Sequence, residues 1–449
     1  MREGTEKSLW IPIAVVLFLL ACIGGVFIGY IQRRNTEQVL RFGMIAGSYW
    51  DVPTGNCYEV VDAAIARFEE KNPGIKVEYV SGILQEDYLE WLAEQILLGE
   101  EPDVFMIPAG ELDMFASLGV LKELETLMEN DSEFQKDAYY SGAYNYGNIR
   151  QVQYALPYES VPTLMFVNKT LLNREGISLP KENWSWDDFL SLCRRVTKDT
   201  DGDGVIDQFG CFDYGWREAV HSNGVPLFEK DGTASCFADA RVEAAVRYVR
   251  ELNRINEGFT VTAREFDEGN VAFRPFAFSE YRTYKPYPWR IKKYSDFEWD
   301  CVKLPAGPDG NGQSQLRTLL MGMSSRTGQE ALAWEFMKEL CYAEETQLHL
   351  LRASQGMPVI KKAAQSPLLS QALGNDIPGN NHMDVRVIQE VMEEAVEAPN
   401  FRQYSSAMSL ADGEISRIIS GDVSIDSGLL KLQREINGVL KEGWTEFVQ

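Results

Sequence analysis

Residues 57–80, CYEVVDAAIARFEEKNPGIKVEYV, carry the clearest structural signal in this chain of 449 residues. Apolar side chains in the first half recur at the spacing of one helix face, at Val60, Val61, Ala64, Ile65 and Phe68. Asn72-Pro73-Gly74 stops a helix, and Ile75–Val80 then alternates apolar and polar residues as a strand does. The pattern therefore predicts a helix over Cys57–Lys71 and a strand directly after it.

The flanking segments continue this alternation of strands and helices. Val39–Met44 reads as a strand, and downstream the pattern predicts a helix over Glu86–Leu98, a strand over Asp103–Ile107 and a helix over Gly110–Leu118. Strands that alternate with helices form a parallel sheet covered by helices. The same alternation recurs after residue 150, which predicts two α/β halves with a small-molecule site where their strand ends face each other.

The composition is that of a globular, acidic protein. Apolar residues make up 45% of the chain and charged residues 24%, and the length suits about three domains or two large ones. With 67 Asp and Glu against 43 Lys and Arg, the formal charge is −24. A surface this acidic repels phosphates, which excludes nucleic acid as the main partner. The 3 histidines argue against histidine-based zinc chemistry.

An uncharged apolar stretch of 23 residues, 9–31, precedes this body. As a helix with about 1.5 Å per residue it would span about 34 Å, enough to cross a hydrocarbon core of about 30 Å. We expect an uncleaved single-pass anchor in the lipid bilayer, with a short tail over 1–8, a linker over 32–37 and the body outside the membrane. A lipoprotein signal at Cys22 and a cleaved signal peptide are the alternatives.

Short motifs follow a fixed order along about residues 38–442. They are FEEKNPGIKV at 68–77, PDVF at 102–105, GVLKEL at 119–124, YALPY at 154–158, VNK at 167–169, WSWDDF at 184–189, GNVAF at 269–273, LPAGP at 304–308, AWEF at 333–336, GMP at 356–358 and ISGD at 419–422. In this order they resemble the family 1 extracellular solute-binding proteins, which are the carbohydrate receptors of ATP-binding-cassette importers.

The resemblance implies a two-lobed, periplasmic-binding-protein-like α/β fold of type II, in which each lobe is a mixed sheet flanked by helices. In this family the chain crosses between the lobes repeatedly. By position we expect crossings near Gln151–Tyr154, Leu304–Gly310 and Ala353–Val359. The N-terminal lobe would hold 38–152 and 309–355, and the C-terminal lobe 153–305 and 356–449.

The resemblance also implies a function. A non-catalytic receptor outside the membrane would capture a sugar or oligosaccharide by hinge closure and deliver it to the permease subunits of an importer. Because a full anchor replaces the usual cleaved or lipidated signal, a sensory sugar-binding module for a signalling system is an alternative. A carbohydrate-active enzyme is another, although the sequence contains no P-loop, HExxH, GxSxG or GxGxxG fingerprint.

A sugar has apolar C–H faces and a rim of hydroxyls, so its site needs aromatic platforms and planar polar groups. Side chains that follow predicted strands or the first crossing segment meet this need, namely Ser48, Tyr49, Trp50, Glu111, Tyr158 and Glu159. The resemblance adds Trp216, in a loop that carries a stacking aromatic in the family, and Phe276, Phe278 and Tyr281 follow a predicted strand in a comparable way. Helix-start or helix-packing motifs make three other tryptophans structural, Trp184, Trp186 and Trp334. We expect Trp216→Ala to weaken sugar binding at least about tenfold without lowering the melting temperature in the absence of sugar.

The acidic loop DTDGDGVIDQ, residues 199–208, predicts a structural Ca²⁺ site. Its carboxylates and one backbone carbonyl occupy the odd positions of a calcium loop, at Asp199, Asp201, Asp203, Val205 and Asp207. It is not a full EF-hand, because Gly210 stands where a bidentate Glu belongs. Related loops of some solute-binding proteins also ligate at the tenth position, which makes Gln208 a further candidate. A phosphatase motif is not supported, because the preceding Phe189–Thr197 reads as a helix.

The cysteines show neither a CxxC motif nor zinc spacing. One, Cys22, falls in the apolar stretch, and the others are spread along the body at positions 57, 193, 211, 236, 301 and 341. A body of this size does not need disulfides for its core, so we expect buried thiols.

Overall fold

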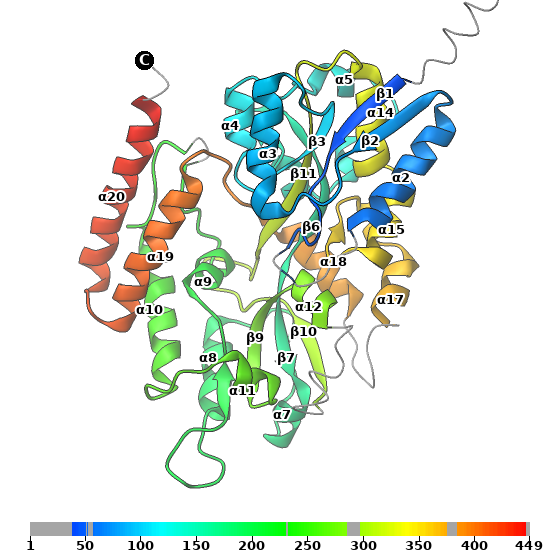
Figure 1. Ribbon diagram of the computed structural model, residues 1–449. Helices are drawn as coiled ribbons and strands as arrows, with labels where there is room; N and C mark the ends of the chain where they lie inside the picture. The colour runs from blue at the N-terminus through cyan, green and yellow to red at the C-terminus, as the bar shows by residue number, and fades with distance from the viewer. Residues whose placement is uncertain are drawn as a thin grey trace, which may run out of the picture.

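A sheet of 7 strands forms the centre of the first lobe in the computed structural model (Figure 1). The strands are β1 Gln38–Gly43, β2 Ile75–Tyr79, β3 Val104–Ile107, β6 Ala155–Val161, β11 Gln315–Met323, β12 Met357–Pro358 and β13 Val396–Glu397. Their order is β12-β6-β11-β3-β1-β2, with β13 beside β11. Because β1 is parallel to β2 and β3, whereas β11 is antiparallel to β3 and β6, the sheet is mixed, as predicted.

The structure describes residues 38–50, 52, 57–229, 232–284, 297–374 and 384–445. The predicted tail over 1–8, the anchor over 9–31 and the linker over 32–37 therefore lie outside the described residues. Within the described ranges, no helix combines the length and the apolar character that crossing a bilayer requires.

Helices cover the sheet of the first lobe. They are α2 Cys57–Lys71, α3 Gln85–Leu98, α4 Leu112–Ser117, α5 Glu125–Asn130, α6 Ser141–Asn145, α14 Glu330–Cys341, α15 Glu344–Ala353, α16 Lys361–Ala364, α17 Pro367–Gly374 and α18 Val385–Glu394, with a short 3₁₀ turn at Lys136–Ala138. The predicted apolar stripe of α2 is buried along its whole length and packs toward α14 and α15. Phe68 of α2 meets the ring of Phe336 edge-on, with centroids 5.1 Å apart. The spacing of apolar residues in the sequence therefore identified the core-facing side of this helix correctly.

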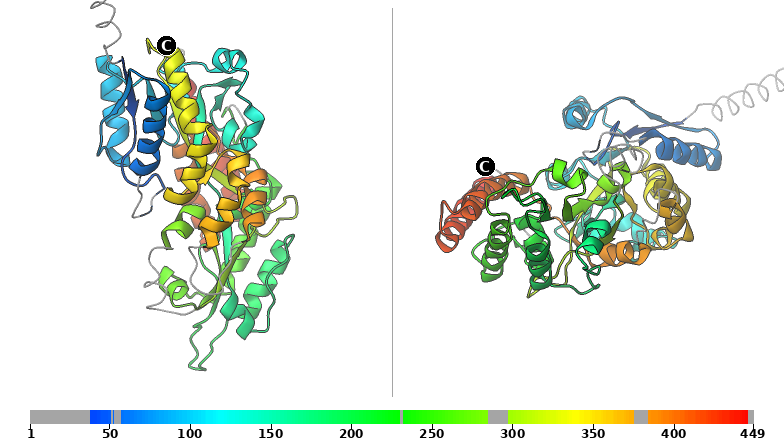
Figure 2. Two further views of the ribbon diagram at one scale, coloured as in Figure 1. Left: turned by 90° about the vertical axis from the view of Figure 1, so that its right-hand side faces the viewer. Right: turned by 90° about the horizontal axis from the view of Figure 1, so that it is seen from below.

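A sheet of 4 strands, in the order β10-β7-β9-β8, forms the second lobe. Its strands are β7 Thr163–Asn168, β8 Phe209–Cys211, β9 Val271–Ala277 and β10 Trp299–Val302. Its helices are α7 Lys169–Arg174, α8 Trp186–Val196, α9 Trp216–Ser222, α10 Ala240–Arg254, α11 Ala263–Asp267, α12 Phe278–Tyr284, α19 Tyr404–Ser420 and α20 Ile425–Thr445. A separate hairpin pairs β4, Asn148–Ile149, with β5, Val152–Gln153. Figure 2 shows the two lobes end to end along the long axis of the molecule.

The predicted lobe boundaries need two corrections. β6 was assigned to the second lobe with residues 153–305, but it pairs with β11 and β12 inside the larger sheet. Residues 356–395 were also assigned to the second lobe, yet α16 and α17 pack on α15, and α18 packs on α6. The chain therefore passes to the second lobe after Val161 and again between β13 and α19. The passage near Leu304–Gly310 agrees with the prediction, because β10 and β11 belong to different sheets.

The tryptophans expected to be structural are buried, and each makes a hydrogen bond or a ring contact within its own lobe. Trp184 Nε1 donates to the carbonyl of Lys303 at 2.9 Å, and Trp186 stacks on Tyr248 with centroids 4.4 Å apart. Trp334 Nε1 donates to Asp131 at 3.0 Å. The cysteines of the described ranges are free thiols, and all but Cys236 are buried, as expected.

Candidate functional site

Glu159 is the centre of a buried polar cluster in the first lobe. It stands on β6 and is 0% exposed. The indole Nε1 of Trp50 donates a hydrogen bond of 2.6 Å to its Oε1, and the hydroxyl of Ser354 donates to its Oε2. A Cβ on Gly356 would lie 2.7 Å from Oε2, so only glycine allows the chain to pass this close to the carboxylate. We call these four residues the Glu159 cluster.

Burial raises the pKa of Glu159 to about 7, because a charged carboxylate loses its hydration there. The hydrogen bonds from Ser354 and Trp50 and the charge of Arg282 oppose this rise, since each stabilises the ionised form. Arg282 lies on α12 and donates from Nη2 to the carbonyls of Leu351 and Ser354, at 2.7 and 3.1 Å. The helix α12, which directly follows strand β9 of the second sheet, thus contacts the segment that contains Ser354, a hydrogen-bond donor to Glu159.

Ser48 and Tyr49 tie the loop after β1 to the same segment. Ser48 Oγ donates to Oε1 of Gln355 at 3.1 Å and accepts from the backbone N–H of Trp50 at 3.2 Å. Tyr49 and Tyr158 line a cavity of about 10 Å³, whose other lining residues are Gly47, Cys57, Val60, Ala353, Ser354 and Gln355. Burial raises the pKa of both tyrosines well above the usual range. Tyr158 is only 1% exposed and is therefore part of the core.

Trp216 forms a second polar group with residues of α19. It is the first residue of α9, and its Nε1 donates to Oδ1 of Asp412 at 3.1 Å. Arg217 binds both oxygens of the same carboxylate, at 3.1 and 2.6 Å, and its guanidinium lies 5.4 Å from the centroid of the Trp216 ring. Because one carboxylate accepts from the indole and the guanidinium, both side chains are fixed in orientation.

Strand β11 links the two groups. Gln315 Nε2 lies 3.5 Å from the hydroxyl of Tyr404, the first residue of α19, and the guanidinium of Arg317 lies 5.6 Å from the centroid of the Trp50 ring. Residues two apart on a strand point to the same face. The side of β11 that carries Gln315 and Arg317 therefore runs from the Trp50 indole toward the helix that holds Asp412.

Glu111 approaches the same region from the first lobe. It directly precedes α4, is half-buried, and burial raises the pKa of its carboxyl. Its neighbours touch the start of α19: Gly110 lies close to Ser405, and the backbone N–H of Arg402 donates to Asp113 at 3.3 Å. The loop of Glu111 therefore meets the start of α19, whereas Trp216 contacts Asp412, about two turns further along the same helix.

The three aromatic residues predicted to follow a strand are buried: Phe276 lies within β9, and Phe278 and Tyr281 lie in α12, directly after it. Phe276, Phe278 and Tyr281 are 4%, 1% and 5% exposed. Phe276 packs on Phe166 and Phe266, and the ring of Tyr281 meets Trp299 edge-on at 5.5 Å. These rings form the core beneath α12, so they support the site rather than line its surface.

Sequence reasoning missed the charged partners of the site. Arg317 of β11 and Asp412 of α19 are far along the chain from the indoles that they contact, and Arg282 of α12 is far from the carbonyls of Leu351 and Ser354. No local motif marks them, because single arginines and aspartates on helices usually face solvent. Arg217 had a signal, since it directly follows the predicted Trp216.

The acidic loop brings three of its carboxylates together. Oxygen atoms of Asp199, Asp201 and Asp207 lie within 4.8 Å of one another. Asp199 accepts from the backbone N–H groups of Gly202 and Gly204 at 2.7 and 2.8 Å, and these bonds lower the pKa of its carboxyl. Both glycines have positive φ, 80° and 89°, which lets the loop fold around Asp199. Such an all-oxygen donor set fits a hard cation such as Ca²⁺.

Two predicted ligands stand apart from these three carboxylates. Asp203 accepts from the backbone N–H of Val205 at 2.8 Å and is not a member of the group. Gln208 is 1% exposed, and its Nε2 donates to the carbonyl of Val196 at 2.7 Å and to Glu175 at 3.0 Å. The amide of Gln208 therefore serves the interior of the lobe in this structure.

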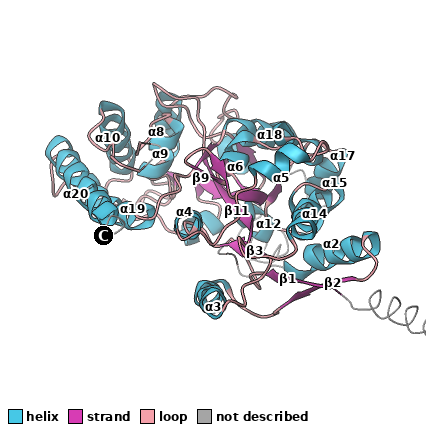
Figure 3. Ribbon diagram, turned by 90° about the horizontal axis from the view of Figure 1, so that it is seen from above, coloured by secondary structure: helices cyan, strands magenta, loops and turns pink. Residues whose placement is uncertain are grey.

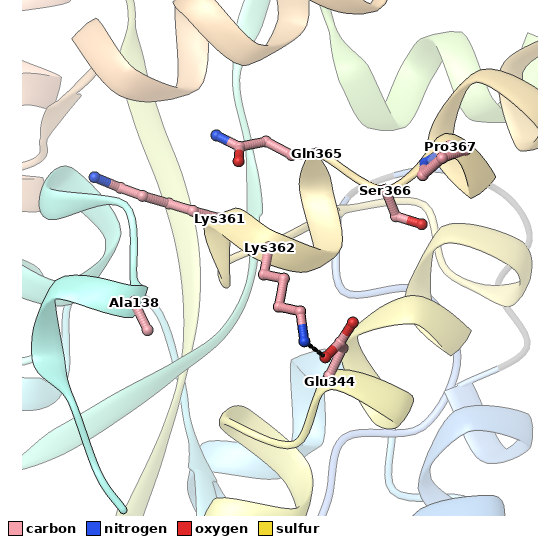
Figure 4. A pocket seen from close by; sticks show the side chains of 7 residues that line it. All are labelled: Ala138, Glu344, Lys361, Lys362, Gln365, Ser366 and Pro367. Atoms are coloured by element: carbon pink, nitrogen blue, oxygen red, sulfur yellow. Dashed lines mark hydrogen bonds and ion pairs between the residues drawn. The ribbon is translucent and has the colours of Figure 1, made fainter.

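A surface pocket of about 560 Å³ lies elsewhere on the first lobe (Figure 4). Its lining is Ala138, Glu344, Lys361, Lys362, Gln365, Ser366 and Pro367. Lys362 pairs with Glu344, and Lys361 pairs with Glu393 at 3.0 Å. None of the predicted ligand-binding residues lines this pocket, and all of its lining comes from one lobe.

Comparison with known proteins gives the same architecture and a family. Residues 54–344 match the model of the bacterial extracellular solute-binding proteins. A putative binding protein of Brucella abortus is 22% identical over 408 residues, which cover 88% of this chain and 92% of that protein.

Solved structures with the same fold are also distant in sequence from this chain. A cyclic alpha-maltosyl-1,6-maltose binding protein from Arthrobacter globiformis aligns with a TM-score of 0.75 at 17% identity, over 90% of this chain and 99% of that one. The sugar-binding protein MalE from Xanthomonas citri aligns with a TM-score of 0.74 at 17% identity, over 92% of this chain and 100% of that one. The match of the family model over most of the body, together with the two-lobed fold, places this chain in the bacterial extracellular solute-binding protein family.

Proposed function

We propose that this protein is an extracytoplasmic receptor that binds a sugar or oligosaccharide between its lobes without altering it. The observation that carries the proposal is that each lobe holds an indole bonded to a carboxylate, Trp50 with Glu159 in the first and Trp216 with Asp412 in the second. β11 contacts Trp50 through Arg317 and the first residue of α19, the helix of Asp412, through Gln315. Indole faces suit the apolar C–H surfaces of a sugar, and carboxylates and guanidiniums suit its hydroxyls. The similar structures include a cyclic alpha-maltosyl-1,6-maltose binding protein and a sugar-binding protein, which supports the same class of ligand.

Closure of the two lobes is the proposed means of capture. A ligand stabilises a closed form only if it binds that form more tightly than the open one, which requires contacts from both lobes. The first lobe contributes Trp50, Glu111 and Arg317, and the second contributes Trp216 and Arg217. Arg282 lies on α12, directly after strand β9 of the second sheet, and its guanidinium bonds the carbonyls of Leu351 and Ser354 in the first lobe. We propose that this contact between the lobes changes when ligand binding changes their relative position.

Membrane attachment and delivery complete the proposed role. The uncharged stretch over 9–31 would anchor the body to the outer side of the membrane, with lipidation at Cys22 as the alternative, and permease subunits of an importer would receive the ligand. Resistance of the full chain to carbonate extraction from membranes tests the anchor. Co-purification of permease subunits with the full chain tests the delivery partner.

A structural Ca²⁺ in the acidic loop is a second, independent proposal. Asp199, Asp201 and Asp207 would hold the ion, with the Val205 carbonyl as a further ligand. Three carboxylates at this separation repel one another in the absence of a cation. The loop follows α8 in the second lobe and shares no contact residue with the Glu159 cluster, so its role would be to stabilise that lobe.

Thermal-shift screening of the full chain against a sugar panel tests the central proposal. A bound ligand raises the stability by RT ln(1 + [L]/Kd). We expect at least one mono- or oligosaccharide to raise the melting temperature in a concentration-dependent way and to be recovered chemically unchanged. Turnover of that sugar by the purified protein would identify an enzyme instead.

A further inference from the structure

The first lobe exposes leucines at the end where strand β1 begins. Leu97 and Leu98 are the last residues of α3 and are 87% and 63% exposed. Leu118 directly follows α4 and is 63% exposed. We call these three residues the leucine edge. Apolar side chains gathered at one surface of a soluble lobe mark a contact with another molecule or with lipid.

Hydrogen bonds from two adjacent residues join the helix ends that carry the leucine edge. Arg326 Nη2 donates to the carbonyl of Ile96 at 2.9 Å, and Ser325 Oγ donates to the carbonyl of Gly119 at 2.5 Å. Figure 3 shows α3 and α4 on the same side of the first lobe, the side of β3. The leucines therefore belong to one surface of the lobe.

The chain enters the lobe at this same end. Because β1 is parallel to β2 and β3, the three strands start at one edge of the sheet, and α3 returns to that edge before β3 begins. Arg41 of β1 donates to the carbonyl of Glu100, just beyond the leucines of α3. β1 starts at Gln38, and only 6 residues, 32–37, separate it from the uncharged stretch over 9–31.

We propose that the leucine edge contacts the surface of the bilayer, an inference that rests on the membrane anchor of the proposed function. A linker of that length reaches about 20 Å when fully extended, so the edge where β1 starts is held close to the lipid headgroups. Exposed leucines gain free energy by entering the interfacial layer. The formal charge of −24 makes an anionic surface repulsive, so the partner is a zwitterionic lipid surface.

This contact would set the distance of the ligand site from the membrane surface. β1 spans about 20 Å at 3.3 Å per residue. Trp50 follows the far end of β1, and Glu111 follows the far end of β3. Docking would therefore place the site about one strand length from the headgroups, in a state that captures a dissolved ligand before delivery to the permease subunits.

Depth-dependent quenching of a fluorophore tests this contact in the full chain. The variants Leu97→Cys and Leu430→Cys carry an environment-sensitive label in a background with Cys22→Ala and Cys236→Ser, because the other thiols are buried. Leu430 lies on α20, is 53% exposed, and is the matched control. Both proteins are reconstituted into phosphatidylcholine vesicles with or without a doxyl group on the acyl chain. Flotation of the vesicles reports the anchor, and the sugar-induced thermal shift reports ligand binding, so their failure is separable from failure of docking.

We expect the label at position 97 to emit at shorter wavelength and to be quenched at least about threefold more by doxyl lipid than the label at position 430. Equal quenching at the two positions in protein that floats with the vesicles would overturn the proposal. A shifted emission that doxyl lipid does not quench, and that disappears when the ratio of protein to lipid is lowered, would show that a second copy of the chain covers the leucine edge. That result would also overturn the proposal. Protein that does not float with the vesicles would remove both the anchor and the docking.

Discussion

The indole of Trp50 and the carboxylate of Glu159 are joined by a hydrogen bond of 2.6 Å, and the two side chains are 5% and 0% exposed. An ionised carboxylate without hydration is unfavourable, and the indole N–H replaces part of the lost water. The bond therefore connects the loop after the first strand to β6, and its strength depends on whether Glu159 is ionised.

Glu159→Gln should change how stability depends on pH. The pKa of Glu159 is raised to about 7 in the folded protein from 4.5, so the folded state holds the proton longer than the unfolded state. The contribution of Glu159 to the free energy of unfolding is fully present below pH 4.5 and is lost as the pH rises to about 7. At 1.36 kcal/mol per pKa unit, the loss is about 3 kcal/mol. The glutamine does not titrate, so the variant should gain about that much relative to wild type between pH 4.5 and 8.

Urea unfolding at several pH values measures this difference. Glu70→Gln removes the same charge from an exposed position and is the control. If the Glu159 variant and wild type keep a constant difference from pH 4.5 to 8, the carboxyl does not titrate with a raised pKa.

Trp50→Phe should destabilise the protein more at high pH than at low pH. Phenylalanine retains most of the ring but cannot donate to Glu159. A hydrogen bond to a charged group contributes about 1.5–3 kcal/mol, and one to a neutral group about 1 kcal/mol. The variant should therefore lose about 1 kcal/mol or more of unfolding free energy at pH 8 beyond what it loses at pH 5. A pure packing defect would lower the unfolding free energy equally at both pH values.

Asp412→Asn should weaken ligand binding with little change in stability. The carboxylate orients Trp216 and Arg217, and the Arg217–Asp412 pair is 37% and 48% exposed, so its contribution to folding is at most about 1 kcal/mol. We expect affinity for the sugar found by screening to fall at least about tenfold, or 1.4 kcal/mol, in calorimetric titration. Glu251→Gln breaks an exposed ion pair with Arg194, whose side chains are 49% and 56% exposed, and should leave affinity unchanged. Unchanged affinity in the Asp412 variant would remove this group from the site.

Trp216→Ala is a poor test of binding, which corrects the expectation from sequence. The ring is 7% exposed and belongs to the core of the second lobe. Truncating a buried tryptophan costs about 3–5 kcal/mol. The variant should lower the melting temperature even without sugar, and differential scanning calorimetry of the unliganded protein measures this loss directly.

Removal of calcium should lower the melting temperature if the acidic loop holds the ion. EDTA should lower the thermal midpoint and added Ca²⁺ should restore it, because an ion bound only to the folded state stabilises that state. Asp199→Asn should abolish the response, while Asp203→Asn should keep most of it, since Asp203 stands outside the group of three carboxylates. A midpoint that ignores both EDTA and Ca²⁺ in wild-type protein would contradict the proposed calcium site.

Local periodicity predicted the elements of the first lobe well. The helix over Cys57–Lys71 has the predicted bounds, and the helix predicted over Glu86–Leu98 starts one residue earlier, at Gln85. The residues that define a helix face and the residues that end a helix lie close together in the chain, so a short stretch of sequence is enough to predict both.

The local sequence of a strand does not indicate which of two sheets the strand will join. Every residue of β6 is buried, and such a strand reads alike in either lobe. Its place beside β11 and β12 depends on hydrogen bonds to residues far along the chain. The predicted crossing at Gln151–Tyr154 was therefore wrong.

The aromatic and acidic residues of the candidate site come from the sequence and remain a prediction as ligand contacts, whereas their pairing could not be predicted. Trp50, Glu159 and Trp216 follow strands or family motifs, whereas Asp412 lies 195 positions from the Arg217 that it binds. Gln208 was expected to be near the cation because it follows the acidic loop. It turns inward because it directly precedes β8 and its amide meets Glu175 and Val196.

The thermal midpoint of the full chain across a panel of mono- and oligosaccharides tests the central claim most directly. We predict that at least one sugar raises the midpoint, that the rise grows with the logarithm of its concentration, and that Asp412→Asn shifts this dependence to at least about tenfold higher concentration. A midpoint that no sugar in the panel moves would contradict the account of a carbohydrate receptor.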